Sequence, residues 1–357
     1  MNIHKATNDY EVWLGKQLKL VPGDLASKHA QMSDGPFPFL RATFYRWMQV
    51  WPEVCKECDD APKALAVGDL HVENFGTWRD AEGRLVWGIN DFDEAYSLPY
   101  TLDLVRLAAS AVLAQGHHSA LDARRACDAI VSGYRECLRV GGRPFVLSDR
   151  HPWLSTIAAS DLREPGAFWQ RMKELPAVSE PMPKDAAAAI ETLMPQRGLR
   201  YRVVRRMKGL GSLGHQRFIA LADHHGGLIS REAKALSASA CAWAADQPEA
   251  PIQYEAILAA ATRCPDPLVK VFGKWLVRRL APDCSRIELA SLSRVNDQAR
   301  LLHAMGWETA NVHRGTAGAD KLIRRDLKQR PRRWLRDAVK AMLKATMKDW
   351  QEWREPS

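Results

Sequence analysis

The sequence predicts an α+β fold that combines short antiparallel strands with a larger helical part. Residues 63–67 and 84–89 have the length and composition of strands, and each leads into a loop with acidic residues. Two further stretches, 217–221 and 228–235, are separated by a His-His-Gly-Gly turn and predict a hairpin. Residues 104–113 form an apolar run typical of a buried helix.

The composition is that of a globular protein. A chain of 357 residues with 46% hydrophobic residues can form two or three compact units with real cores. Because no apolar run reaches about eighteen residues and residues 1–5 lack a signal-peptide pattern, we expect a cytoplasmic protein without membrane contact. Seven scattered cysteines argue against a disulfide framework, and Cys55 and Cys58 form a lone CxxC without the further ligands that a zinc site needs.

The segment 68–76, Gly-Asp-Leu-His-Val-Glu-Asn-Phe-Gly, has the strongest chemical signal. Phosphoryl transfer requires a carboxylate that orients the attacking hydroxyl and oxygen ligands that hold Mg²⁺ against the nucleotide phosphates. Asp69 and Asn74, five residues apart, fit these two roles and are predicted as catalytic residues. We expect His71 to brace the loop through hydrogen bonds.

A second acidic cluster follows the strand 84–89. Asp91, directly after this strand, is predicted as a catalytic metal ligand. Asp93 is a candidate second metal ligand, although it and Glu94 are also compatible with solvated carboxylates. Leu102-Asp103-Leu104 opens an apolar helix after this cluster, and Asp103 is also compatible with a plain cap of the helix 104–113.

A glycine-rich segment lies in the second half of the chain. Gly209, Gly211 and Gly214 have GxGxxG spacing, and together with Ser212 they are predicted to bind a nucleotide. The strand pattern of 217–221 comes next, where a dinucleotide-binding fold would need a helix. The glycines therefore favour a β-hairpin that covers phosphates.

The strand 228–235 contains Lys234, which is predicted to bind the nucleotide phosphates. A lysine in this role is normally steadied by a glutamate on a helix. Glu255, on the predicted helix 252–262, is the candidate partner, and Glu249 is the alternative. A further strand is expected at 274–280, and residues 281–285 are the candidate contact for an adenine base.

The formal net charge of +9 is concentrated near the end of the sequence, where residues 317–357 contain twelve Lys and Arg and six Asp and Glu. Apolar residues recur there at helical spacing from Leu335 to Trp350, which predicts an amphipathic helix with a basic outer face. Such a face is compatible with plain solvation and with binding of nucleic acid or an acidic partner.

These motifs resemble the series of sequence motifs found in aminoglycoside phosphotransferases and related small-molecule kinases. The chain as a whole is similar to the bacterial family called domain of unknown function 2252. That similarity depends on residues 38–41, 68–76, 90–94, 209–214, Lys234 and Ser239. It implies a protein-kinase-like fold with a small antiparallel β lobe and a mainly helical lobe, with ATP and Mg²⁺ as cofactors.

The order of the motifs departs from ordinary kinases, because Asp69 precedes Gly209 by 140 residues. The resemblance therefore implies a circular permutation, which domains with termini at the surface tolerate. Residues 301–313 resemble the kinase helix that leads into the catalytic loop. The expected units are a helical segment 1–66, helical-lobe residues 67–195 with both acidic loops, a nucleotide-binding lobe 196–288 and C-terminal helices 289–357.

The first histidine of the phosphotransferase motif is replaced by Val67, and no peptide-docking segment follows Asp91. We therefore expect the transfer of phosphate to a small-molecule hydroxyl, with nucleotidyl transfer on the same fold as an alternative. The sequence Asp69-Leu70-His71 also imitates a two-metal phosphoesterase, although the further ligand motifs are absent. The third alternative is a nonenzymatic protein that binds nucleotides or nucleic acid.

Overall fold

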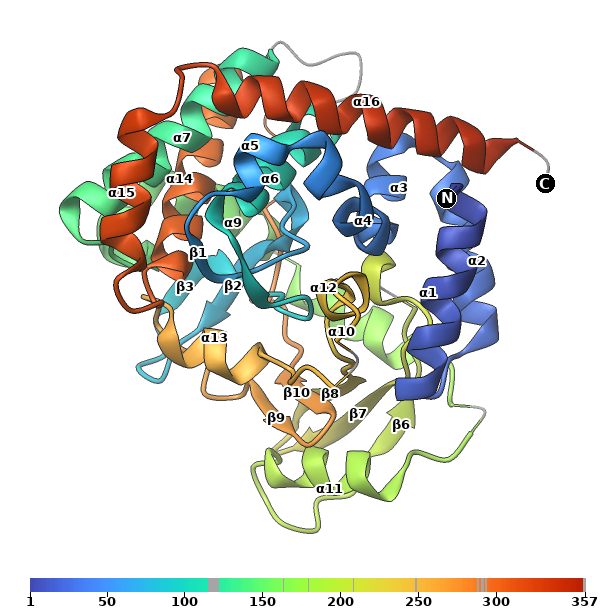
Figure 1. Cartoon of the computed structure of the whole chain (residues 1–357). Coiled ribbons are helices and arrows are strands. Elements are labelled where there is room, and N and C mark those ends of the chain that lie inside the picture. The colour runs from blue at the N-terminus through green and yellow to red at the C-terminus, as the bar shows by residue number, and fades with distance from the viewer. Residues whose placement is uncertain are drawn as a thin grey trace.

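The computed structural model describes residues 1–355, with the exception of 115–121, 163, 179, 208, 248, 288, 290, 291 and 293. It is an α+β structure with small antiparallel sheets, as the sequence predicts. Most helices lie on one side of the molecule, and the largest sheet lies at the opposite end (Figure 1).

The N-terminal part of the chain is helical and is followed by two small sheets. Its helices are α1 (Ile3–Gln17), α2 (Pro22–Ser33), α3 (Pro36–Ala42), α4 (Phe44–Val54) and α5 (Lys56–Asp59). Strands β1 (Lys63–Ala66) and β4 (Tyr96–Pro99) form an antiparallel pair. A second sheet has the order β2-β3-β5 and consists of β2 (Phe75–Arg79), β3 (Leu85–Ile89) and β5 (Phe145–Val146). The predicted strands 63–67 and 84–89 are thus confirmed.

The middle of the chain consists of helices that surround these strands. They are α6 (Tyr100–Ala114), α7 (Ala123–Val140), α8 (Leu147–Arg150), α9 (Pro152–Leu162), α10 (Pro165–Glu174) and α11 (Lys184–Thr192). The apolar stretch 104–113 lies within α6, whose residues are buried from Tyr100 to Ala111. A helix that is covered on all sides in this way belongs to the interior of the protein.

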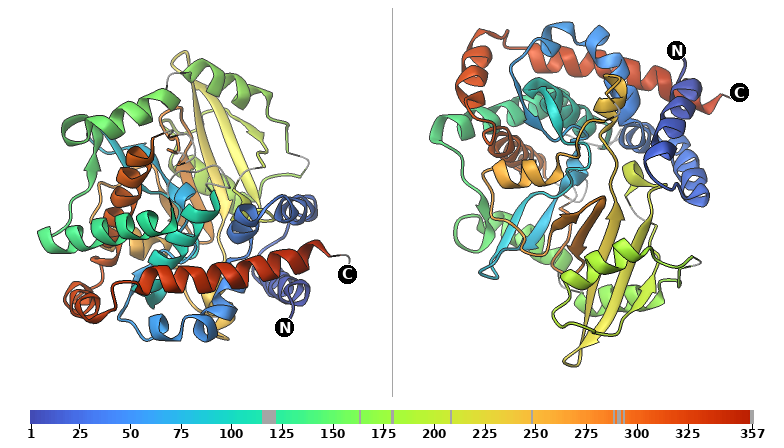
Figure 2. Two further views of the ribbon diagram at one scale, coloured as in Figure 1. Left: turned by 90° about the horizontal axis from the view of Figure 1, so that it is seen from above. Right: turned by 60° about the horizontal axis from the view of Figure 1, so that its bottom comes forward.

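The largest sheet has the order β6-β7-β8-β10-β9, and all its pairings are antiparallel. Its strands are β6 (Arg202–Val204), β7 (Arg217–His224), β8 (Gly227–Ala235), β9 (Lys270–Phe272) and β10 (Trp275–Arg279). The predicted hairpin corresponds to β7 and β8, which meet at the turn between His224 and Gly227. In the right view of Figure 2 this sheet lies at the bottom of the molecule, where α11 packs against β8 and β10.

The remaining helices are α12 (Ala240–Ala244), α13 (Tyr254–Ala260), α14 (Val295–His313), α15 (Ala319–Gln329) and α16 (Trp334–Arg354). The predicted amphipathic helix is α16, which buries Leu335, Val339 and Met342. It crosses the top of the molecule in Figure 1 and ends beside α1, where the ring of His4 stacks on Trp353 with centroids 4.9 Å apart. No helix of the described residues is long and apolar enough to cross a membrane.

Candidate active site

The loop after β1 is fixed by a buried aspartate. Asp103 in α6 accepts hydrogen bonds from the backbone N–H groups of Val67 (2.8 Å) and Gly68 (2.9 Å). The loop turns at Gly68, where φ is +83° and a Cβ would lie 2.4 Å from the carbonyl oxygen of Glu94. The interpretation of Asp103 as a plain cap of its own helix is wrong, because it lies inside α6 and satisfies buried donors of the loop instead.

Asp69 points into a cavity and is held from behind by Arg106. The guanidinium donates to Asp69 Oδ1 through Nε (2.8 Å) and Nη2, and it stacks on the rings of Phe44 and Trp47. Burial raises the pKa of Asp69, although Arg106 opposes this shift. A carboxylate with a fixed orientation and an elevated pKa is suited to accept a proton.

Sequence reasoning missed Arg106. The sequence feature that could have revealed it is a single arginine within the apolar stretch 104–113, because a fully buried charge requires a partner.

His71 and Asn74 stabilise the 3₁₀ turn Val72–Asn74 through reciprocal hydrogen bonds. The side-chain oxygen of Asn74 accepts from the backbone N–H of His71 (2.6 Å), and His71 Nδ1 accepts from the backbone N–H of Glu73 (3.2 Å). The prediction that His71 braces the loop is confirmed. Burial lowers the pKa of His71 well below its usual range, so the ring is neutral and carries its proton on Nε2.

Lys234 meets the second acidic cluster. Its amine lies 2.5 Å from Asp93 Oδ2 and 3.7 Å from Asp91 Oδ1. Burial and the charge of Asp91 raise the pKa of Asp93 to about 6. Burial would also raise the pKa of Asp91, but Lys234 and Arg278 outweigh it and hold the value below its ordinary range.

These two carboxylates have the chemistry of a magnesium site. Asp93 Oδ1 is buried and has no hydrogen-bond partner among the described residues. The side chain of Asp91 is 38% exposed. The single amine of Lys234 does not neutralise both the Asp91 and the Asp93 carboxylates. Mg²⁺ prefers carboxylate oxygens and keeps several waters, so Asp91 and Asp93 fit it, with Asn74 lining the same cavity. In the described part of the chain, no group of three or more His, Cys, Asp or Glu side chains is arranged to hold a metal ion.

The expected pair between Lys234 and Glu255 is not formed. Glu255 is exposed on α13, and its carboxylate accepts from the backbone N–H of Val271 at 3.4 Å. Glu249, the alternative partner, is exposed as well. The prediction is wrong because α13 packs at the β9 edge of the sheet, whereas the amine of Lys234 faces the Asp91 loop.

The glycine segment connects β6 to β7 and contains a short 3₁₀ turn, Leu210–Ser212. Gly209, Gly211 and Ser212 line the cavity around Asp69. An added Cβ on Gly211 would lie 3.3 Å from Asp69 Oδ2, so the glycine segment contacts the loop that contains Asp69. Gly214 differs from the prediction: it lies outside the cavity, and its carbonyl accepts from the backbone N–H of Val21 at 2.8 Å.

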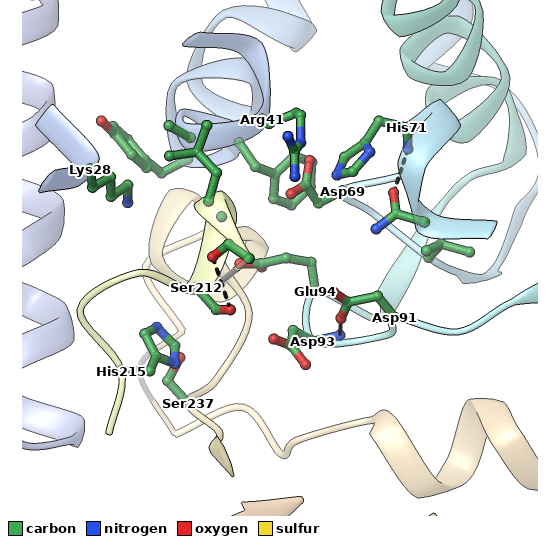
Figure 3. Close-up of a pocket in the computed structure, with 18 of the residues that line it drawn as sticks. Lys28, Arg41, Asp69, His71, Asp91, Asp93, Glu94, Ser212, His215 and Ser237 are labelled. Carbon is green, nitrogen blue, oxygen red and sulfur yellow. Dashed lines mark hydrogen bonds between the residues drawn. The ribbon is translucent and has the colours of Figure 1, made fainter. Parts of the chain in front are cut away.

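A cavity and a larger cleft meet beside Asp91. A small cavity of about 50 Å³ surrounds Asp69 (Figure 3), and a larger cleft of about 840 Å³ lies between the five-stranded sheet and β2. The two share Asp91, Gly209, Ser212 and Arg286. The expected adenine contact, residues 281–285, lies along the wall of the cleft.

The cleft is rich in cations that the sequence did not reveal as a group. They are Arg171, Arg206, Arg217, Lys234, Arg263, Arg278, Arg279 and Arg286. Glu232, fully buried on β8, pairs with Arg217 (3.0 Å) and Arg278 (2.6 Å). Burial would raise the pKa of Glu232, but these arginines outweigh it and hold the value well below its usual range. The available signal was the alternation of Glu232 and Lys234 on one face of β8, with Arg278 paired to Glu232 across β10.

The comparisons with known proteins support one of the sequence resemblances. Residues 20–151 match the family described as "Uncharacterized protein conserved in bacteria (DUF2252)". This match confirms the similarity to domain of unknown function 2252 over a segment that includes Asp69, Asn74, Asp91 and Asp93. The glycine segment and Lys234 lie outside it. No curated protein and no solved structure matches the chain.

Proposed function

We propose that this protein is an ATP- and Mg²⁺-dependent phosphotransferase whose acceptor is a small-molecule hydroxyl. The observation that carries the proposal is that the cavity around Asp69 and the larger cleft meet at Asp91. On one side of this junction lies Asp69, whose carboxylate is suited to orient a hydroxyl group. On the other side lies the cleft, which is lined by Lys234 and several arginines. Phosphoryl transfer needs these two environments in direct contact.

Each side of the junction has a distinct task in this proposal. Asp69, held by Arg106, orients the acceptor hydroxyl and takes its proton as the new oxygen–phosphorus bond forms and ADP leaves. Lys234, Arg217 and Arg278 bind the nucleotide phosphates. Bound Mg²⁺ supplies positive charge to the phosphates, and Asp91 and Asp93 would hold it. Gly211 has no side chain, so the backbone of the glycine segment can lie close to Asp69.

A kinase-like fold in permuted order is part of the proposal. The helix that resembles the one before a kinase catalytic loop is α14, and its last residue, His313, bonds to Asp103 at 2.9 Å. Just beyond it, the hydroxyl of Thr316 accepts from the backbone N–H of Leu65 in β1 (2.7 Å). The end of α14 thus lies beside the strand that leads into Asp69, which is the arrangement that a permutation of the kinase order requires.

The decisive experiment uses ATP labelled at the γ- or the α-phosphate, with the intact protein and a cell extract. We expect the γ-label in a small-molecule product. Transfer of the α-label would instead identify a nucleotidyl transferase on the same site. Release of free phosphate without transfer would favour a phosphoesterase, for which His71 offers no support because its Nδ1 already caps the 3₁₀ turn.

Binding is tested separately by thermal unfolding. Mg²⁺ and ATP together should raise the Tm, since a ligand at about 100 times its Kd stabilises the native state by about 2.7 kcal/mol. Asp69→Asn should keep this shift and lose turnover, whereas Lys234→Met should reduce the shift. Lys270→Met, at an exposed position of the same sheet, is the matched control. The absence of any nucleotide-dependent shift would refute the proposed function.

A further inference from the structure

The cavity around Asp69 contains a buried lysine without a carboxylate partner. Lys28 lies on α2, is 2% exposed and lines the cavity on the side opposite His71 (Figure 3). Among the described residues, only the more distant charges of Glu11, Glu94 and Asp69 act on its amine, and no hydrogen bond does. The amine lies over the face of the Tyr45 ring, 5.7 Å from Nζ to the ring centroid.

Such a group is costly in a folded protein. Lysine is almost never fully buried unless it is paired, because water solvates an ammonium group far better than a protein interior does. Burial lowers the pKa of Lys28, although the more distant charges of Glu11, Glu94 and Asp69 attract the ammonium form. An apolar side chain would pack against Tyr45 without this cost, so packing alone does not account for Lys28.

The other charges around the cavity already have partners. Asp69 is paired with Arg106, and Asp93 is paired with Lys234. Glu94 accepts from the hydroxyl of Ser239 and a backbone N–H, both at 2.7 Å, and burial raises its pKa to about 7.

Arg41 and Arg286 share the single carboxylate of Glu73, at 3.0 and 2.9 Å. Lys28 is therefore the cation at this cavity that has no ion-pair partner among the described residues, whereas Asp91 shares the amine of Lys234 with Asp93. A hydroxylated cation, such as an aminoglycoside, would meet this ammonium group without compensation.

We propose that Lys28 binds an anionic group of the acceptor, so that the acceptor is a small hydroxylated anion with a carboxylate or a phosphate. This inference depends on the proposed role of Asp69, which would receive the hydroxyl at the other end of the same molecule. The cavity volume of about 50 Å³ has room for roughly four water molecules, which fits a compact ligand.

A neutral histidine in the wall of the cavity suits the hydroxyl groups of such a ligand. His215 Nδ1 donates to the carbonyl of Ala235 at 2.9 Å, and burial lowers the pKa of His215 to about 4. The ring is therefore neutral, and Nε2 is left as a hydrogen-bond acceptor. It can accept from a hydroxyl without competing with Lys28 for the anionic group.

The test is direct binding, measured by calorimetry without nucleotide, of four small probes of similar size. Glycerate and glycerol 3-phosphate carry the two anionic groups, glycerol is neutral, and choline is cationic. We expect saturable binding of at least one anion, with no comparable binding of glycerol or choline. The preferred anion distinguishes a carboxylate from a phosphate.

Variants assign the binding to the lysine. Lys28→Met should weaken anion binding by about tenfold or more, because a charge-assisted hydrogen bond is lost, and Lys28→Gln should do the same. Lys16→Met, at an exposed lysine of α1, should leave it unchanged. The shift of Tm by Mg²⁺ and ATP should persist in all three variants and shows that they are folded.

Three results would overturn the inference: equal anion affinity in Lys28→Met, binding of choline or glycerol as tight as that of the anions, or no binding of either anion. If the ATP shift persists in any of these cases, the inference fails while the proposed function stands. If the ATP shift is also absent from the unmodified protein, the proposed function itself fails.

Discussion

His313 at the end of α14 donates a hydrogen bond to Asp103 of α6, with 2.9 Å between Nε2 and Oδ2 and both side chains fully buried. The same carboxylate accepts from the backbone N–H groups of Val67 and Gly68. One buried anion therefore joins a helix near the end of the chain to the loop that carries Asp69. Its geometry controls both the stability of the fold and the position of the candidate catalytic carboxylate.

Asp103→Asn tests this junction. The amide can accept only with its single oxygen, and its NH₂ group faces donors that a carboxylate satisfied. We expect a loss of about 2–5 kcal/mol in the free energy of unfolding, measured by urea denaturation, together with loss of turnover. Asp337→Asn is the matched control, because Asp337 is 58% exposed and surface pairs contribute less than about 1 kcal/mol. Equal stability of both variants would contradict the assignment.

Gly211→Ala tests the contact between the glycine segment and the loop that contains Asp69. The new methyl group would lie 3.2 Å from the carbonyl oxygen of Arg41 and 3.3 Å from Asp69 Oδ2, so the neighbours must move by a few tenths of an ångström. We expect the fold and the ATP-dependent Tm shift to persist while turnover falls by about 10- to 100-fold, because small displacements of reacting groups are expensive. Gly23→Ala, where a Cβ meets nothing within 4 Å, should leave turnover unchanged.

The features that the sequence predicted correctly are those with local causes. The hairpin of β7 and β8 follows from alternation and a turn, and the 3₁₀ brace at His71 follows from a polar residue at the start of a loop. The strand pattern in the sequence located Lys234 correctly, but it did not identify the carboxylate that pairs with Lys234. Asp93 lies 141 residues away along the chain, and only the assembled fold brings the two together.

Burial is the second property that the sequence did not reveal. Arg106 and Lys28 are both nearly inaccessible, yet only Arg106 stands within a continuous apolar stretch that makes a buried charge conspicuous. Lys28 lies on a short helix with mixed polarity and is covered by segments that are distant in the sequence. The charge balance of the cavity therefore required the structure.

Glu94 predicts a pH dependence of stability. Burial raises its pKa from 4.5 to about 7, so between these values the native state binds more protons than the unfolded state. The free energy of unfolding should then fall as the pH rises through this window, by about 3 kcal/mol in total. Glu308, whose pKa burial also raises to about 7, adds a similar contribution that Glu94 variants retain.

Glu94→Gln removes the contribution of Glu94 and keeps an acceptor for Ser239. We expect the variant to be more stable than the unmodified protein at about pH 8 and to lose this advantage at about pH 5, as measured by urea denaturation. Glu255→Gln, at an exposed carboxylate, is the control and should not change the pH dependence. An advantage of Glu94→Gln that is the same at both pH values would contradict the assignment.

The order of the motifs along the chain can be changed in an engineered protein. The ends of the described chain are adjacent, since His4 Nε2 lies 3.2 Å from the carbonyl oxygen of Glu352. A short Gly/Ser linker between residues 355 and 2, with new termini in the exposed stretch 196–198, would place Gly209 and Lys234 before Asp69 and Asp91. New termini in exposed loops are tolerated, so we expect a folded protein with the same Tm shift by Mg²⁺ and ATP. A permutant with the same linker but opened after Ser230, inside β8, should not fold, because the central strand of the five-stranded sheet is cut. If both permutants lose the nucleotide-dependent shift while the first remains folded, the kinase-like arrangement of the two parts is wrong.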